Sequence, residues 1–137
     1  MLGEFFAAKP EEIDDSIVEE GPHGRFATVE ANGLSHVPIA RLGEILAAGA
    51  YDDLILGIEG RGASSGEAAL FSVPEAIRDA LADAEDLDAT ADRWASTDEL
   101  RLGGWGAESA RDLLGILSSL AREARTDGRV LWYWWSL

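Results

Sequence analysis

Two histidines, His23 in "GPHG" and His36 in "SHVP", are the only imidazole side chains in the sequence. Each stands beside a turn signal, and no H-x-x-x-H spacing joins them. A metal site would therefore require both loops to meet and a carboxylate to complete the ligand set. Neither histidine has a serine partner at a sequence spacing that indicates a catalytic pair. We expect two separate loop histidines, with no metal site and no catalytic residue.

The glycine-rich stretch "GIEGRGASSGE" has the composition of a phosphate-binding loop, but it lacks the G-K-[ST] ending and its only cation is Arg61. The run "DLDATADRWAST" begins like a calcium-binding loop. However, Ala91 stands where that loop requires glycine, and Thr97 stands where it requires the bidentate glutamate. We interpret the first stretch as a flexible loop, reject the second as a calcium site, and expect no cofactor.

The closing stretch "RVLWYWWSL" contains three of the five tryptophans. In an extended chain its side chains alternate between two faces that are both strongly apolar, Val130, Trp132 and Trp134 on one and Leu131, Tyr133 and Trp135 on the other. A strand that is apolar on both faces is normally a central one. The alternative is an exposed aromatic platform for a sugar ring, a planar ligand or a quaternary ammonium group. We expect the central strand.

The composition is strongly acidic, with 26 Asp and Glu against 11 Lys and Arg and a formal net charge of −15. Such a surface repels phosphate backbones and anionic lipids, so we expect no binding to nucleic acid or to membranes. The charge is compatible with a solubilising surface, with adaptation to high salt, or with acidic mimicry of nucleic acid. It also predicts that a protein partner would present a basic surface.

The sequence contains no cysteine, which excludes disulfides, thiolate metal ligands and cysteine nucleophiles. Its first residues, "MLGEFFAAKPEE", lack the basic start and the apolar stretch of a secretory signal. The longest uninterrupted apolar run is 130–135, far shorter than the ~20 residues needed to span a bilayer. We therefore expect a cytoplasmic protein.

Periodicity and capping signals predict the elements in the first half of the chain. "FFAA" fits either a short strand or the lead into a helix, and a helix is expected over 10–20 with Pro10 at its start. "RFATVEANG" alternates like a strand over 26–29 and ends in an Asn-Gly turn. A helix follows over "VPIARLGEILAAG". "YDDLILGIEG" fits a helix or a short buried strand, of which we favour the helix.

In the second half, "AALFSV" predicts a strand that leads directly into a helix opening at Pro74. A second amphipathic segment surrounds Trp94, and Ser96 with Glu99 has the spacing of a capping box for a further short helix. The longest helix is expected over 108–125. A continuous apolar stripe runs along one of its faces: Ala110, Leu113, Leu114, Leu117, Leu120, Ala121 and Ala124.

These elements predict a single α+β domain over residues 1–137, in which a small mixed or antiparallel sheet packs against several helices. The long C-terminal helix and the aromatic core strand that follows it form the centre of the domain. The oligomeric state cannot be predicted from these patterns.

For function, the acidic composition and the lack of a catalytic signature favour a non-catalytic interaction protein of a bacterial accessory, immunity or inhibitor-like kind, with a basic protein as its partner. The alternative is a small-molecule-binding protein or an enzyme with a tryptophan-lined pocket beside the loop 60–66. The candidate ligand-binding residues are Trp94, Trp105, Arg61, His23 and His36.

Overall fold

A central antiparallel sheet of five strands, in the order β2-β1-β5-β4-β3, organises the chain. A computed structural model describes all of residues 1–137. The elements, in chain order, are β1 (Leu2–Ala8), η1 (Pro10–Glu12), α1 (Asp15–Glu20), β2 (Val29–Glu30), α2 (His36–Ile45), α3 (Tyr51–Gly57), β3 (Gly60–Gly62), β4 (Ala68–Val73), α4 (Glu75–Asp83), α5 (Leu87–Ala95), α6 (Asp98–Leu102), α7 (Ala107–Asp127) and β5 (Val130–Ser136). The predicted α+β fold, with an antiparallel sheet and a long C-terminal helix followed by an aromatic core strand, is confirmed.

The aromatic strand β5 is the middle strand of the sheet. It pairs with β1 on one edge over its whole length and with β4 on the other edge over most of it. The hydroxyl of Tyr133 donates to the carbonyl of Ala31 at 2.7 Å, and the indole of Trp134 donates to the carbonyl of Val18 at 2.9 Å. The prediction of a central strand is confirmed, and the polar groups of the Tyr133 and Trp134 side chains are satisfied inside the protein.

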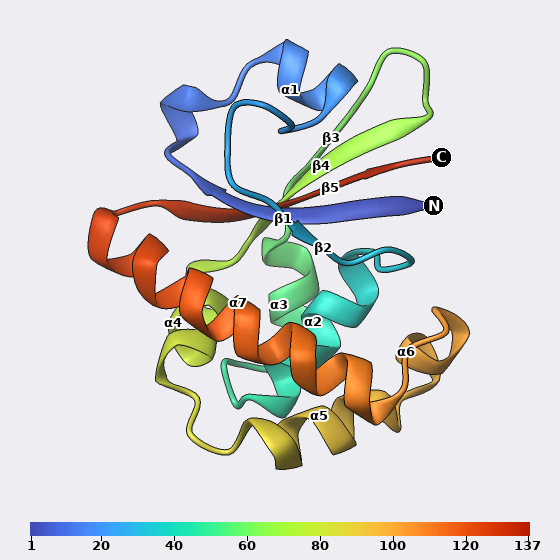
Figure 1. The fold of residues 1–137 in the computed structure, drawn as a ribbon, viewed down its shortest axis with the longest axis vertical. Helices are drawn as coiled ribbons and strands as arrows, with labels where there is room; N and C mark the ends of the chain where they lie inside the picture. The colour runs from blue at the N-terminus through green and yellow to red at the C-terminus, as the bar shows by residue number, and fades with distance from the viewer.

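Helices cover both faces of the sheet (Figure 1). The lower layer contains α2 to α7 and packs on the face that carries Leu131 and Tyr133. The upper layer contains η1 and α1, and packs Ile17 against Phe6 and Trp134. The lower core has 23 buried residues and the upper core has 8, so most of the apolar burial lies between the sheet and the long helices.

Helix α7 crosses the lower face of the sheet as the sequence periodicity predicts. Its apolar stripe is buried except for Leu120, which lies partly exposed near the end of the helix. Gly128 ends the helix in a left-handed conformation with φ 67°, and the N–H of Arg129 bonds back to the carbonyl of Ala124. None of the helices, α7 included, contains an apolar stretch of the length needed to cross a membrane.

Two predicted helix boundaries are wrong because a neighbouring residue provides a better cap. The helix expected over 10–20 is divided into η1 and α1, since Asp14 adopts an extended backbone and its carboxylate caps the N–H of Ile17. Further along, Thr97 and not Ser96 starts helix α6, and its hydroxyl accepts from the N–H of Leu100. The helix favoured for "YDDLILGIEG" is present as α3.

Two predictions at the sheet edges are also corrected. The strand expected over 26–29 is present only as β2, which is two residues long, because the chain joins the sheet at Val29 and the residues before it do not pair with β1. The glycine-rich stretch is partly ordered by pairing, since 60–62 forms β3 against β4 and only the tip of the hairpin remains a loop. β1 confirms the strand alternative for "FFAA".

The buried face of α7 makes a stability prediction. Replacing Leu117, which is 1% exposed, by alanine should lower the free energy of unfolding by ~2 to 5 kcal/mol, because it leaves a cavity in the lower core. The neighbouring Ile116 is 52% exposed, so Ile116→Ala is a matched control that should change stability little. Chemical denaturation of both variants checks this, and equal effects would show that the helix presents a different face.

The hydroxyl of Tyr133 makes a second prediction. Tyr133→Phe removes the donor to the buried carbonyl of Ala31, and an unpaired buried carbonyl should cost ~1 to 3 kcal/mol in denaturant titrations. Tyr51→Phe is the control, because the Tyr51 ring lies under the guanidinium of Arg41 and its hydroxyl makes no hydrogen bond in the protein. A Tyr133→Phe protein as stable as the wild type would contradict the assigned bond.

Candidate functional site

The two candidate tryptophans outside β5 each donate an indole hydrogen bond to a distant segment of the chain. Trp94 of α5 is fully buried, and its indole N–H donates to the carbonyl of Pro38 in α2 at 3.0 Å. Trp105, just before α7, is partly buried and donates to the carbonyl of Asn32 at 2.9 Å. Neither lines any of the four surface hollows, and each indole joins two segments that are far apart in the sequence.

Arg61 and His36 lie on opposite sides of the sheet. Arg61 of β3 forms an ion pair with Asp15 of α1 at 2.8 Å and ties the hairpin to the upper layer. His36 begins α2, and its ring centroid lies 5.3 Å from that of Phe71 at the lower core. The structure therefore does not bring the five candidate residues together, and the loop 60–66 does not adjoin Trp94 or Trp105.

His23, like Arg61, pairs with a carboxylate, which is that of Glu4 in β1. Its Nε2 lies 2.6 Å from Oε1 of Glu4, and the imidazole is 62% exposed while the carboxylate is 12% exposed. The ring also meets the edge of Trp134. The other carboxylate oxygen, Oε2 of Glu4, is the one buried side-chain polar atom in the protein without a hydrogen-bond partner.

A carboxylate bound to one ring nitrogen fixes the orientation of an imidazole and leaves the other nitrogen free to take up a proton. The His23–Glu4 pair has this geometry, with Nδ1 facing away from the carboxylate. No hydroxyl group bonds to the ring, however, and no set of three His, Asp or Glu side chains lies close enough to hold a metal ion. The pair therefore orients a surface imidazole without assembling a nucleophile or a metal centre around it.

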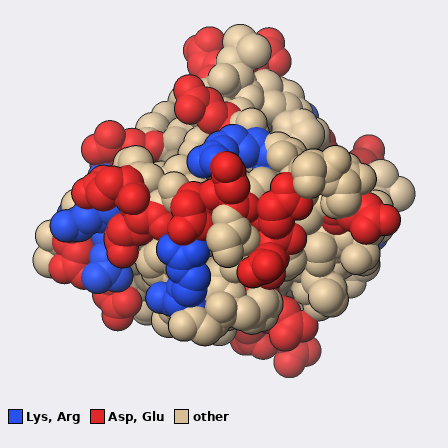
Figure 2. All heavy atoms as spheres, turned by 90° about the horizontal axis from the view of Figure 1, so that it is seen from above, with Lys and Arg blue, Asp and Glu red and all other residues tan.

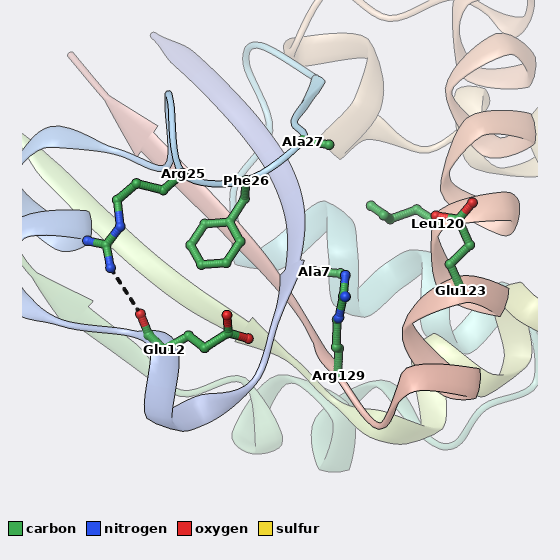
Figure 3. Close-up of a pocket in the computed structure, with 8 residues that line it drawn as sticks. All are labelled: Ala7, Glu12, Arg25, Phe26, Ala27, Leu120, Glu123 and Arg129. Atoms are coloured by element: carbon green, nitrogen blue, oxygen red, sulfur yellow. Dashed lines mark hydrogen bonds between the residues drawn. The ribbon is translucent and has the colours of Figure 1, made fainter.

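A hollow of about 310 Å³ opens at the edge of β1, and we call it the edge hollow. Figure 3 shows Glu12 and Phe26 on one side of β1 and the α7 side chains on the other, with Arg129 between them. Its lining residues are Ala7, Glu12, Arg25, Phe26, Ala27, Leu120, Glu123 and Arg129. Three other surface hollows, of about 320 to 440 Å³, lie along the helices of the lower layer and around α6.

The edge hollow exists because two strands separate. β1 and β2 pair at Phe5 and Val29. Hydrogen-bonded pairs recur at every second residue of an antiparallel ladder, so the next such pair in this register would be Ala7 with Ala27. No backbone hydrogen bond joins those two alanines. Successive residues of a strand direct their main-chain N–H and C=O groups to alternate edges of the strand. The main-chain groups of Gly3 bond to residues on the β2 side. Ala7 is four residues further along β1, so its N–H and C=O point to the same side.

The segment before β2 is held away from β1 by contacts in the upper layer. The guanidinium of Arg25 binds both carboxylate oxygens of Asp14, at 2.9 and 3.0 Å, and the ring of Phe26 stacks on Phe6 with centroids 5.3 Å apart. Gly24 turns the chain with φ 77°, a conformation that other residues rarely adopt. The edge hollow is therefore a built feature and does not result from fraying of a strand end.

Charged groups of both signs line the edge hollow. Glu123 makes no hydrogen bond or ion pair, and Glu12 uses only Oε1, which accepts from the N–H of Lys9. Arg129 is 44% exposed, and its one ion pair is a long one, 3.6 Å to Asp127. Arg25 is already engaged by Asp14. The hollow thus offers two carboxylates and one guanidinium that a ligand could bind.

Exposed carboxylates also dominate the upper surface, which Figure 2 views from above. They come from η1, from α1 and from the residue that caps α1, and we call them the acidic face: Glu11, Glu12, Asp14, Asp15, Glu19 and Glu20. The hydrogen bond from Arg25 lowers the pKa of Asp14, and the hydrogen bond from the Ser64 N–H at 2.8 Å lowers the pKa of Glu19. These two groups stay ionised at a lower pH than ordinary carboxylates.

No protein family model, curated protein or solved structure matches the chain. The function must therefore be argued from the geometry. The residues of the edge hollow were not identified from the sequence, because they come from five separate segments: β1, η1, the stretch 25–27, α7 and the residue before β5. The one local signal is Gly24, which directly precedes the stretch "RFATVEANG" in which a strand is expected.

The open edge of β1 makes a prediction for hydrogen exchange. The amide of Ala7 should exchange faster than those of Phe6 and Ala8, because the neighbouring amides bond to β5 and that of Ala7 has no partner. Residue-resolved exchange measured by NMR checks this in the free protein. Equal protection of the three amides would show that Ala7 pairs with Ala27 and that the edge hollow is closed.

Proposed function

We propose that the protein is a non-catalytic acidic interaction protein that binds a basic protein partner. The acidic face carries the proposal. Its six exposed carboxylates are accompanied by three basic residues, Lys9, Arg25 and Arg61, and the two arginines are already bound to Asp14 and Asp15. The remaining negative charge faces solvent, where it can attract and orient a basic surface.

Fixed geometry supports recognition beyond simple charge. Asp14 caps α1 and binds Arg25, and Glu19 accepts from the N–H of Ser64 across the layer. These bonds hold the carboxylates in place before a partner arrives, which lowers the entropy cost of ordering them on binding. Glu11 makes no hydrogen bond in the protein, and Glu20 accepts only a long one from Ser16, so both remain available to a partner.

The same electrostatics argues against nucleic acid as the partner. Arg25, Arg61 and Arg125 each lie within 2.9 Å of a carboxylate oxygen, so their charge is locally neutralised. A phosphate backbone would meet net negative charge over the acidic face. We propose a cytoplasmic role of an accessory, immunity or inhibitor-like kind in a bacterium, in which the protein covers a basic surface of another protein.

The alternative of a small-molecule binder or enzyme has one observation in its favour, the edge hollow, whose charged groups converge from both layers. The pocket first expected beside Trp94 and Trp105 does not support it, because no tryptophan lines any of the four hollows. We therefore rank a protein partner first.

A rate measurement tests the proposal. A partner captured from a cell lysate and purified should associate with the protein at a rate that falls steeply as salt rises from about 10 mM to about 500 mM. Removing two charges with Glu11→Gln and Glu20→Gln should slow association further. The control pair Glu108→Gln and Asp112→Asn removes equal charge at the start of α7 and should slow it less. Equal effects of the two pairs would exclude the acidic face as the contact surface.

Nucleic acid provides the opposing test. Filter binding at low salt is the most permissive condition for cationic contacts to phosphate, and neither duplex DNA nor single-stranded RNA should be retained. Tight retention that is lost as salt rises would contradict the proposed partner class.

A further inference from the structure

The edge hollow contains a main-chain donor and acceptor that the fold leaves without partners. Ala7 is 6% exposed, and its N–H and C=O point toward the gap left by the missing pair with Ala27. Buried main-chain groups of folded proteins are almost always hydrogen-bonded. A strand edge with free groups is a template on which a further extended chain can pair.

Only one residue of β1 is open in this way. Phe5 is paired with Val29. The next residue that faces this edge beyond Ala7 is Lys9, whose N–H donates to the Glu12 side chain and whose C=O accepts from the Glu12 N–H. An added chain therefore gains one pair of main-chain hydrogen bonds, those to Ala7. One pair provides little affinity by itself, so side-chain contacts must provide the rest.

The free charges of the edge hollow define those side chains. In an antiparallel pair, the residue opposite Ala7 directs its side chain to the same face as Ala7, which is the lower face where Glu123 lies. The residues on either side of it direct theirs to the upper face, where Glu12 and Phe26 lie. Two adjacent basic residues would thus place one cation beside each carboxylate, while Arg129 can donate to a carbonyl of the added chain.

We propose that the edge hollow binds an extended basic peptide segment of the partner, which pairs with the main chain of Ala7 and places adjacent lysine or arginine side chains beside Glu12 and Glu123. The inference rests on the proposed function, because it gives the basic partner a specific point of attachment. It goes further by assigning the contact to main-chain pairing at one residue of β1.

The probe is the peptide acetyl-Val-Thr-Lys-Arg-Thr-Val-amide, compared with two forms that carry an N-methyl group on the lysine or on the arginine main-chain nitrogen. N-methylation leaves the side-chain charges unchanged and removes one main-chain donor. In an extended chain, only one of the two central N–H groups points to Ala7. One methylated form should therefore bind about tenfold more weakly than the parent, and the other should bind nearly as well.

Substitutions and exchange locate the contact. Glu12→Gln and Glu123→Gln should each weaken binding of the parent peptide by about two- to fivefold, while Glu108→Gln, at the other end of α7, should leave it unchanged. The glutamine at position 12 keeps the oxygen that accepts from Lys9, so the fold is preserved. Saturating peptide should slow exchange of the Ala7 amide and leave those of Phe6 and Ala8 as they were.

Several outcomes would overturn the inference. If the parent and both methylated peptides bind equally well, the acidic surface attracts the cations without main-chain pairing, and the proposed function survives while this site does not. The same conclusion follows if bound peptide does not slow hydrogen exchange of the Ala7 amide. Protection of that amide in the free protein would show that residues 25–28 themselves close the edge hollow, and a parent peptide that does not bind would exclude the site altogether.

Discussion

The rest of the structure depends on the need to cover both faces of β5. A strand with large aromatic side chains on each side cannot leave either face in water, because each buried aromatic side chain removes about 150 to 250 Å² from solvent. The lower face is covered by α7 and the helices packed beside it, and the upper face by α1. The indole of Trp134 donates to a carbonyl of α1 in the upper layer, and the hydroxyl of Tyr133 donates to the carbonyl of Ala31 directly after β2. Hydrogen bonds therefore also join β5 to the upper layer and to the segment at the sheet edge.

The small upper layer both covers one face of the sheet and carries most of its charge on its outer surface. It buries Ile17 and Val18 against the sheet, yet its outer surface consists largely of carboxylates. Those carboxylates cap a helix, bind arginines from distant segments, and fix the hairpin tip at Ser64. Asp14, Asp15 and Glu19 are therefore held in fixed positions, and charges in fixed positions can select a partner instead of only attracting one.

The edge hollow arises from the same upper layer. Arg25 and Phe26 are held above the sheet by Asp14 and Phe6, and these contacts keep the chain apart from β1 beyond the last pair with β2. Contacts that stabilise the cover over β5 thus leave a strand edge open beside α7. His23 directly precedes Gly24 in this segment, and its partner Glu4 belongs to β1. The buried Oε2 of Glu4 is a second polar group of β1 that has no hydrogen-bond partner.

The sequence by itself determined the elements whose side chains are strongly periodic. The alternation of 130–135 and the apolar stripe of α7 each admit one buried arrangement, so β5, α7 and the α+β class could be predicted. Only the tertiary structure decided where the weaker patterns end. Alternation over 26–29 does not say whether Ala27 will find Ala7, because that pairing competes with the contacts of Arg25 and Phe26 to residues far away in the sequence. Local spacing also does not determine which distant segments lie together. The bond between Trp94 and Pro38 and the pair of His23 with Glu4 could therefore not be predicted from the sequence.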